Sequence, residues 1–213
     1  MKKHTSELGA QTPFPIVVLV SGSGSNLQTL IDAIAKGTLS ARIAAVICNK
    51  ADAYALQRAQ EANIPTEIIA HADYETRDAF DAELTRRIEK YQPELIVLAG
   101  FMRILTADFV NHFYGKMINI HPSLLPKYRG LHTHKRALDA GDSEHGLSIH
   151  YVSAELDGGP IIFQQSVPVL ADDTEKSLAQ RVLVQEHLAY PQVIEWFAQG
   201  RLQLVDNQVI LSE

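Results

Sequence analysis

The sequence predicts a single α/β domain built on a seven-stranded, mainly parallel sheet flanked by helices. Short apolar runs alternate along the chain with segments that have the apolar spacing of an amphipathic helix. Such alternation is typical of βαβ units whose helices cover both faces of a parallel sheet. The chain has 213 residues, of which 46% are hydrophobic and 21% charged. It is therefore long enough to bury one large core.

The first half of the chain supplies the alternating elements. Residues 16–20, IVVLV, form a fully apolar run that ends in a glycine-rich loop. In the helix expected next, apolar residues share one face: Leu27, Leu30, Ile31 and Ile34. Further strands are expected at 41–49, 66–70 and 94–100, and further helices at 51–65 and 76–93. The predicted strands and helices thus alternate along the first half of the chain.

The second half departs from this pattern after Pro122. Residues 146–152, GLSIHYV, and 161–169, IIFQQSVPV, predict two strands joined by a turn at 157–160, which indicates antiparallel additions to the sheet. A long helix is expected from about Thr174 to Gly200, with Asp173 or Thr174 as its cap and Gly200 at its end.

Composition limits the class of protein. The formal net charge is -6, which argues against nonspecific binding of nucleic acid or anionic membranes. Cys48 is the only cysteine, so no intrachain disulfide is possible and a reducing, cytoplasmic location fits. No apolar run approaches a membrane span. Residues 1–13 read as a polar leader without a signal-peptide core, before one domain at 14–213.

The loop SGSGSN, residues 21–26, is the first candidate site. Glycines between a strand and a helix let backbone N–H groups converge, and the helix dipole adds positive potential, so the loop suits a phosphate. The loop lacks the third glycine of a dinucleotide fingerprint, because Leu27 stands there, and it lacks a P-loop lysine. The second strand ends in Cys48 and Asn49 rather than an acidic residue that would hold a ribose. A phosphomonoester is favoured over a dinucleotide or triphosphate, and a purely structural turn is the alternative.

The strand in KMINIHPSLLP, residues 116–126, carries polar side chains in an apolar run. Successive side chains on a strand point to opposite faces, so Ile118 and Ile120 share one face while Asn119 and His121 share the other. One interpretation is a strand end whose polar residues meet water or neighbouring backbone. The other is a pair of donors presented to a ligand.

Asp157 lies in the glycine-rich turn LDGGPII, where an aspartate commonly bonds nearby backbone. A histidine that performs acid–base chemistry often needs a carboxylate, and Asp157 is the loop-borne candidate. Asn119 would add an amide donor aimed at a developing oxyanion. The chain has no G-x-S-x-G, and Cys48 lies within an apolar strand. We therefore expect the substrate to bring its own nucleophile.

The nine histidines raise the question of a metal site. His132, His134, His145 and His150 follow His121, but there is no HExxH or CxxC frame and no two ligands on one helix face. We expect no metal. His145 is interpreted as a turn residue and His150 as a strand residue.

Five segments together resemble the phosphoribosylglycinamide formyltransferases, folate-dependent enzymes of purine synthesis. They are SGSGSNLQ at 21–28, LAGFMRIL at 98–105, NIHPSLLPKYRGLHTHKRAL at 119–138, GDSEHGLSIHYV at 141–152 and LDGGPII at 156–162. The resemblance runs from about Phe14 to Leu204. It implies a Rossmann-like formyltransferase fold. The implied reaction passes the formyl group of 10-formyltetrahydrofolate to the amine of 5-phosphoribosylglycinamide, giving N-formylglycinamide ribonucleotide and tetrahydrofolate in de novo purine biosynthesis.

The resemblance also implies roles for the catalytic candidates. Asn119 would bond the formyl oxygen, and His121 would stabilise the tetrahedral oxyanion and assist proton movement. Asp157 would keep His121 positively charged. Two roles for His121 stay open, proton donor and mainly electrostatic cation. The substrate amine is the nucleophile that the chain itself lacks.

By the same resemblance, Gly24, Ser25 and Asn26 would hold the substrate phosphate. The ribose and glycinamide side would be lined by Leu183, Val184, Gln185 and Glu186. Glu186 is the member of this segment best able to bond hydroxyls or the amine. Leu183 has no polar side chain, where some relatives carry one, so any contact there is through backbone or packing.

The resemblance assigns a third set of residues to the folate: Arg77, Met102, Arg103, Ile104, Leu105, Asn119, Ser153, Ala154, Glu155, Leu156 and Asp157. Arg77 would pair with the carboxylate of the glutamate tail, or else be a solvated residue at the start of a helix. Lys127, Tyr128 and Arg129 are expected in a mobile loop near the site, because Pro126 and Gly130 bracket them.

Three other functions compete with this interpretation. Formyltetrahydrofolate hydrolases use a similar Asn, His and Asp set, but those relatives look longer at the N-terminus. Methionyl-tRNA formyltransferases share the formyl site but carry a further C-terminal domain. The negative net charge of this chain also disfavours binding of tRNA. A non-catalytic module that binds a phosphosugar or a nucleotide would need SGSGSN but not the three catalytic candidates. We expect small-molecule partners only, and a monomer or a homodimer.

Overall fold

The computed structural model describes residues 13–212, so residues 1–12 of the predicted leader lie outside the described residues. Within this range one sheet has seven strands in the order β3-β2-β1-β4-β5-β6-β7. Its strands are β1 (Phe14–Val20), β2 (Ala41–Cys48), β3 (Thr66–Ile68), β4 (Leu95–Leu98), β5 (Met117–His121), β6 (Glu144–Tyr151) and β7 (Ile161–Pro168). The first five are parallel, β6 is antiparallel to β5, and β7 is antiparallel to β6. This confirms the predicted fold class.

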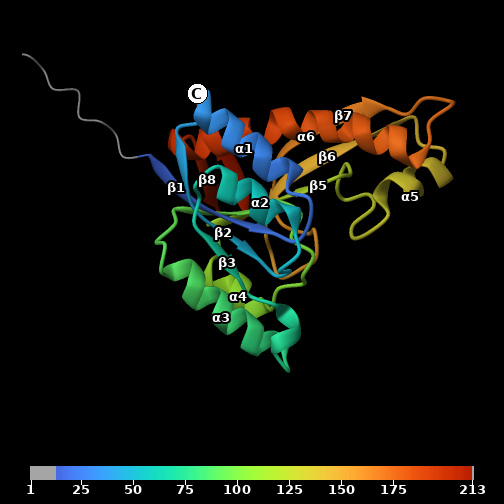
Figure 1. Cartoon of the computed structure of the whole chain (residues 1–213). Helices are drawn as coiled ribbons and strands as arrows, with labels where there is room; N and C mark the ends of the chain where they lie inside the picture. Colours follow the sequence, from blue (N-terminus) through green and yellow to red (C-terminus); the bar gives the residue numbers. More distant parts are fainter. Residues whose placement is uncertain (1–12, 213) are drawn as a thin grey trace, which may run out of the picture.

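Helices cover both faces of the sheet (Figure 1). They are α1 (Ser25–Ala35), α2 (Tyr54–Glu61), α3 (Arg77–Glu89), α4 (Ala107–His112), α5 (Thr133–Asp139) and α6 (Glu175–Ala198), with a short 3-10 helix at His71–Asp73. The helices α1, α2 and α6 lie on one face, and α3 and α4 lie on the other. The sheet is therefore buried between two helical layers.

Strand alternation divides the core into two clusters. On β1, Val18 packs with the α1, α2 and α6 side, whereas Val17 and Leu19 pack with the α3 and α4 side. On β5, Ile118 and Ile120 belong to the first cluster. Because side chains alternate along a strand, Asn119 and His121 lie on the opposite face, as the sequence predicts.

The strand order places a switch point between β1 and β4. From β1 the chain proceeds outward through β2 to β3, then returns to β4 on the other side of β1. In open α/β sheets, ligands bind beyond the carboxyl ends of the strands at such a point. The loop after β1 and the segment after β4 meet there, since the Met102 amide donates to Ser21 Oγ at 2.8 Å.

The assignment of His145 to a turn is wrong, because β6 begins at Glu144 and includes it. Gly146 gives this stretch the composition of a turn, but here the glycine allows β6 and β7 to approach closely. A Cβ at Gly146 would lie 2.1 Å from the Gln165 carbonyl oxygen of β7. The residue is therefore a close contact between paired strands, and His145 is a buried strand residue, 1% exposed.

The long helix is confirmed with its cap. Thr174 and Ser177 form a reciprocal capping box at the start of α6. After the helix, β8 (Leu202–Val205) and β9 (Gln208–Leu211) form a two-stranded hairpin. This hairpin, α4, α5 and the 3-10 helix have no counterpart in the sequence prediction.

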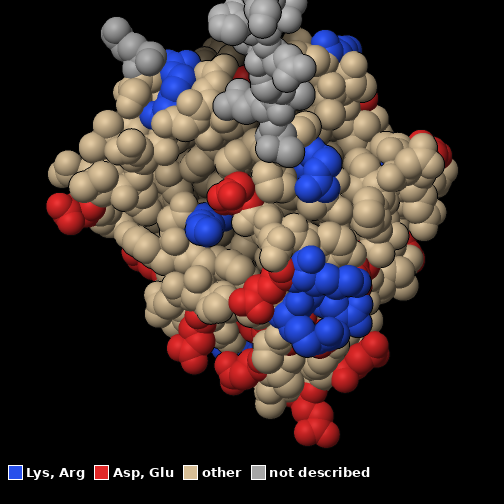
Figure 2. Space-filling view, turned by 90° about the vertical axis from the view of Figure 1, so that its left-hand side faces the viewer, with Lys and Arg blue, Asp and Glu red and all other residues tan. Residues whose placement is uncertain are grey.

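Charged side chains of both signs are mixed on one face of the molecule (Figure 2). On the face shown in Figure 2, basic clusters lie beside acidic ones and form no continuous basic stripe. No helix within residues 13–212 is long and apolar enough to cross a membrane.

Candidate active site

The predicted catalytic residues meet at the end of β5. Asn119 and His121 come from β5, and Asp157 comes from the connection between β6 and β7. His121 Nδ1 lies 3.5 Å from Asp157 Oδ2, and both side chains are buried, 7% and 8% exposed. A turn aspartate and a strand histidine that are 36 positions apart in the sequence are thus partners in the fold.

Both ring nitrogens of His121 face acceptors. His121 Nε2 lies 3.0 Å from the Tyr128 carbonyl oxygen, which can only accept. With the Nε2 proton donated there, Nδ1 carries a second proton toward Asp157 only when the imidazole is charged. Tyr128 and Asp157 therefore offer one acceptor to each N–H of an imidazolium at this position.

His150 is a functional candidate that the sequence prediction leaves as an ordinary strand residue. Antiparallel register places it opposite Asn119. Its Nδ1 donates to the Tyr151 carbonyl oxygen at 2.8 Å, and burial lowers the pKa of its imidazole. The neutral ring then has an unprotonated Nε2, which accepts from Asn119 Nδ2 at 3.3 Å.

This contact fixes the Asn119 amide. One Nδ2 proton is directed at His150, so the second proton of the same nitrogen is left for a ligand. His150 Nε2 also lies 3.7 Å from Asp157 Oδ1, so Asp157 stands between two imidazoles. Predicting a role for His150 would have required the register of β5 with β6, which pairs it with Asn119. A single sequence does not reveal that register.

The predicted phosphate loop opens α1. Gly24 caps the helix in the left-handed conformation and has no side chain, and the Gln28 amide donates to the Gly24 carbonyl oxygen at 2.9 Å. The amides of residues 25–27 therefore have no carbonyl one turn earlier to receive them. These amide N–H groups form an anion-binding surface at the N-terminus of α1.

The fold brings α6 to the same loop. Asn26 Nδ2 donates to Glu186 Oε2 at 2.8 Å, and both side chains are buried. Burial raises the pKa of the Glu186 carboxyl, while the bond from Asn26 opposes that rise. Of the other predicted α6 residues, Leu183 and Gln185 are half-buried and Val184 is exposed. Two segments 160 positions apart thus form one polar site.

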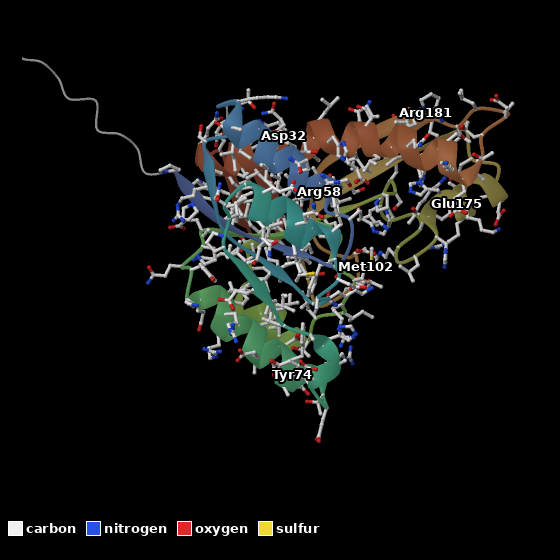
Figure 3. All side chains as sticks on the ribbon, in the orientation of Figure 1. Asp32, Arg58, Tyr74, Met102, Glu175 and Arg181 are labelled. Atoms are coloured by element: carbon white, nitrogen blue, oxygen red, sulfur yellow. The ribbon has the colours of Figure 1, made fainter. Side chains whose placement is uncertain are left out.

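A cleft of about 140 Å³ adjoins the catalytic residues. Most of the predicted folate residues line it: Arg103, Ile104, Leu105, Asn119, Ser153, Ala154, Glu155, Leu156 and Asp157. Leu98, Phe101, Val110, Val152 and His150 complete its wall. Met102 is 65% exposed beyond the carboxyl end of the sheet (Figure 3), and Arg77 is exposed at the start of α3. Neither Met102 nor Arg77 lines the cleft.

The segment around Tyr128 covers one side of the site. The Gly130 amide donates to Asp157 Oδ2 at 2.9 Å, and Arg129 pairs with Glu155. Tyr128 donates its hydroxyl proton to Asp142 at 2.6 Å. The bonds to Asp157 and Glu155 tie the segment to the walls of the cleft, and its motion stays a prediction.

Among the described residues, no group of three or more His, Cys, Asp or Glu side chains is arranged to hold a metal ion.

Comparison with known proteins gives one consistent result. Residues 15–194 match the family model described as formyl transferase. Phosphoribosylglycinamide formyltransferase of Escherichia coli is 54% identical over 197 residues, covering 92% of this chain and 93% of the relative. The enzyme of that name from Haemophilus influenzae is 48% identical over the same shares. A solved phosphoribosylglycinamide formyltransferase from Coxiella burnetii superposes with a TM-score of 0.91 at 56% identity, covering 93% of each chain.

Proposed function

The chain belongs to the formyl transferase family and, within it, to the phosphoribosylglycinamide formyltransferases, and on this premise we propose how its residues carry out the reaction. The family transfers a formyl group from formyltetrahydrofolate to phosphoribosylglycinamide in purine biosynthesis. The observation that carries the assignment is the buried His121–Asp157 pair beside Asn119 at the end of β5.

Formyl transfer needs a stabilised oxyanion. We assign 10-formyltetrahydrofolate as the donor. The substrate amine attacks the formyl carbon, so the carbonyl oxygen gains negative charge as the new C–N bond forms. The free Nδ2 proton of Asn119 would bond this oxygen, and the positive charge of His121 would stabilise it, since groups placed in advance for such a charge lower the barrier. His150 supports the arrangement because its Nε2 holds the Asn119 amide in one orientation.

Collapse of the intermediate breaks the bond between the formyl carbon and N10 of the folate. The amine must lose a proton and the folate nitrogen must gain one, so one proton moves between them. His121 can pass this proton only if the Tyr128 carbonyl gives up the Nε2 proton that it accepts. If that bond persists, His121 acts as a cation beside Asp157.

The substrate is assigned to the α1 and α6 side of the site. Gly24, Ser25 and Asn26 would receive the phosphate on backbone amides, and Glu186 would bond the ribose hydroxyls or the amine. The bond between Asn26 and Glu186 supports this assignment, because it joins the two segments into one surface. Leu183, Val184 and Gln185 would contribute backbone and packing contacts.

The folate is assigned to the cleft bounded by Arg103, Ile104, Leu105 and the 153–157 segment. The cleft is smaller than the 300–1,000 Å³ that ligand pockets usually enclose, so only part of the folate would enter it. The remainder would extend past Met102 toward solvent, with Arg77 proposed to meet the glutamate carboxylates. We further propose a cytoplasmic enzyme, monomeric or homodimeric, whose domain spans residues 14–213 after a polar leader.

The assignment is tested by supplying purified enzyme with 10-formyltetrahydrofolate and phosphoribosylglycinamide, and measuring tetrahydrofolate and the formylated product together. Equal amounts of the two products are expected. Tetrahydrofolate without formylated product would mean that water is the acceptor, and the hydrolase interpretation would replace this one.

A further inference from the structure

The substrate phosphate carries a charge that the predicted site does not balance. A phosphomonoester bears about -1.5 to -2 charges at pH 7. None of the residues assigned to this substrate, at 24–26 and 183–186, is a lysine or an arginine. The fold supplies a cation from a different element, Arg58 of α2.

Arg58 binds the phosphate loop and the first turn of α1 together. Its Nε donates to the Ser23 carbonyl oxygen at 2.9 Å, and its Nη1 donates to Gln28 Oε1 at 2.9 Å. Ser23 precedes the left-handed Gly24, and Gln28 makes the first backbone bond of the helix. The guanidinium therefore spans the backbone that presents the amides of residues 25–27.

The guanidinium is held in place on a third side. It lies over the Tyr54 ring, with 4.7 Å between the guanidinium carbon and the ring centroid. In Figure 3, Arg58 extends from α2 beside α1, and Asp32 lies further along α1. Gln28 links the two, since its Nε2 donates to Asp32 Oδ1 at 2.9 Å. Little side-chain freedom remains to be lost when a ligand binds.

The charge of Arg58 has no acidic partner among residues 13–212. Within the part of the chain that the structure describes, no carboxylate lies within ion-pair distance of it. Arg58 is linked to Asp32 only indirectly, because the Gln28 side chain accepts from Arg58 and donates to Asp32. The positive potential of Arg58 therefore adds to that of the helix dipole at the start of α1.

The loop is also built against α2 at close range. A Cβ at Gly24, whose φ is +71°, would lie 2.7 Å from the Ala55 Cβ, and the Ala55 amide donates to the Gly22 carbonyl oxygen at 3.1 Å. The shape of the loop thus depends on the helix that carries Arg58.

An independent observation indicates that the loop is prepared for a ligand. Asn26, 9% exposed, donates through Nδ2 to Glu186, but its Oδ1 is buried without a hydrogen-bond partner among the described residues. A buried acceptor left unpaired costs free energy. A ligand donor, such as a ribose hydroxyl, would satisfy it.

We propose that Arg58 is a positioning residue for phosphoribosylglycinamide, which sets the loop after β1 and supplies the positive charge that attracts the substrate phosphate. This inference rests on the proposed function. It predicts that Arg58 governs the preference of the enzyme for the phosphorylated substrate over the same riboside without its phosphate.

The test compares kcat/KM for these two substrates in the full-length enzyme and in Arg58→Gln, Arg58→Lys and Arg42→Gln. Arg42 is an exposed arginine at the amino-terminal end of β2, whereas the phosphate loop follows the carboxyl end of the neighbouring parallel strand β1. We expect Arg58→Gln to lower the phosphate preference about tenfold, as loss of one charged interaction would. The loss should lie in the KM for phosphoribosylglycinamide. Arg58→Lys should restore most of the preference, and Arg42→Gln should retain it.

Salt gives a readout that a purely structural role would not alter. The KM of the native enzyme for phosphoribosylglycinamide should rise with sodium chloride, and that rise should be shallower in Arg58→Gln.

An unaltered preference for the phosphorylated substrate in Arg58→Gln, or a loss of that preference in Arg58→Lys as large as in Arg58→Gln, would overturn the inference. If Arg58→Gln does not fold by circular dichroism, the comparison of the native enzyme with Arg58→Lys decides. Failure of the native enzyme to formylate either substrate would instead overturn the proposed function, and calorimetric binding of phosphoribosylglycinamide would still test Arg58.

Discussion

The assigned chemistry depends on two side chains that share one face of β5, the amide of Asn119 and the imidazole of His121. Asn119→Ala and His121→Ala should each lower kcat by about 10²–10³-fold, because Asn119 supplies a hydrogen bond and His121 a positive charge to the developing oxyanion. The KM values should change much less. His112→Ala is a matched control, since His112 is an exposed histidine on α4 that pairs with Glu89. Steady-state rates close to native in either β5 variant would rule out the assigned roles.

His150 should act through Asn119 rather than on the substrate. His150→Ala leaves the Asn119 amide without the acceptor that orients it, so kcat should fall about tenfold, the cost of one hydrogen bond. The fall should be smaller than in Asn119→Ala, and the double variant should be no slower than Asn119→Ala alone. Additive losses in that double-variant cycle would show that His150 works independently.

The two β5 residues were predictable and His150 was not, for a physical reason. The apolar run and the proline at residue 122 define β5, and alternation then assigns Asn119 and His121 to one face. The pairing of Asn119 with His150 depends on strand register across a loop of more than twenty residues, including α5. Nothing local in the sequence reports that register. Arg58 escapes prediction similarly, because its partners lie on another element.

At the element scale, the β6–β7 pairing carries both Asp157 and His150. Gly146→Ala should lower the free energy of unfolding by about 3 kcal/mol, the cost of forcing a methyl group into packed backbone. The added Cβ would meet the Gln165 carbonyl oxygen of β7. Urea denaturation measures the change, with Gly22→Ala as control, where an added Cβ meets nothing within 4 Å. Equal midpoints for the two variants would contradict the described pairing.

The junction of α5 with β6 should make stability depend on pH. His145 Nε2 lies 3.1 Å from His134 Nδ1 of α5, and burial with the neighbouring His134 lowers the pKa of His145 to about 4. Asp142, Tyr128 and His121 also face this cluster. The unfolded chain binds a proton on this residue below about pH 6.5, whereas the folded chain does not until about pH 4.

Stability should therefore be complete above pH 6.5 and fall by up to about 3 kcal/mol as the pH drops toward 4. In His145→Gln this part of the decline should be missing, while the exposed variant His112→Gln should retain it. Urea midpoints across this pH range measure the effect. A decline of the same size in His145→Gln would show that other groups cause it.

Element length decided which elements the sequence could predict. The longer strands and helices have enough apolar repeats to be recognised, and the capping box marks the start of α6. In contrast, α4 and α5 span six and seven residues, too short for their periodicity to be distinct. At the start of β6, the sequence does not distinguish a glycine needed for close strand contact, Gly146, from a glycine needed for a bend.

At the scale of the whole molecule, the switch point between β1 and β4 explains why the site lies where it does. The alternating pattern predicts a parallel sheet, but the order β3-β2-β1-β4-β5 depends on which edge each crossover joins. That order brings the loop after β1, the segment after β4 and the end of β5 to one edge. Sequence patterns indicate the loop after β1 and the end of β5, the family resemblance adds the segment after β4, and the topology gives the physical reason for their meeting.

The most direct test of the whole account is the release of tetrahydrofolate from 10-formyltetrahydrofolate, with and without phosphoribosylglycinamide, in the native enzyme and in His121→Ala. The account predicts release only when phosphoribosylglycinamide is present, and a fall of at least about 10²-fold in His121→Ala. Release that is equally fast without phosphoribosylglycinamide would contradict it, because the formyl group would then pass to water.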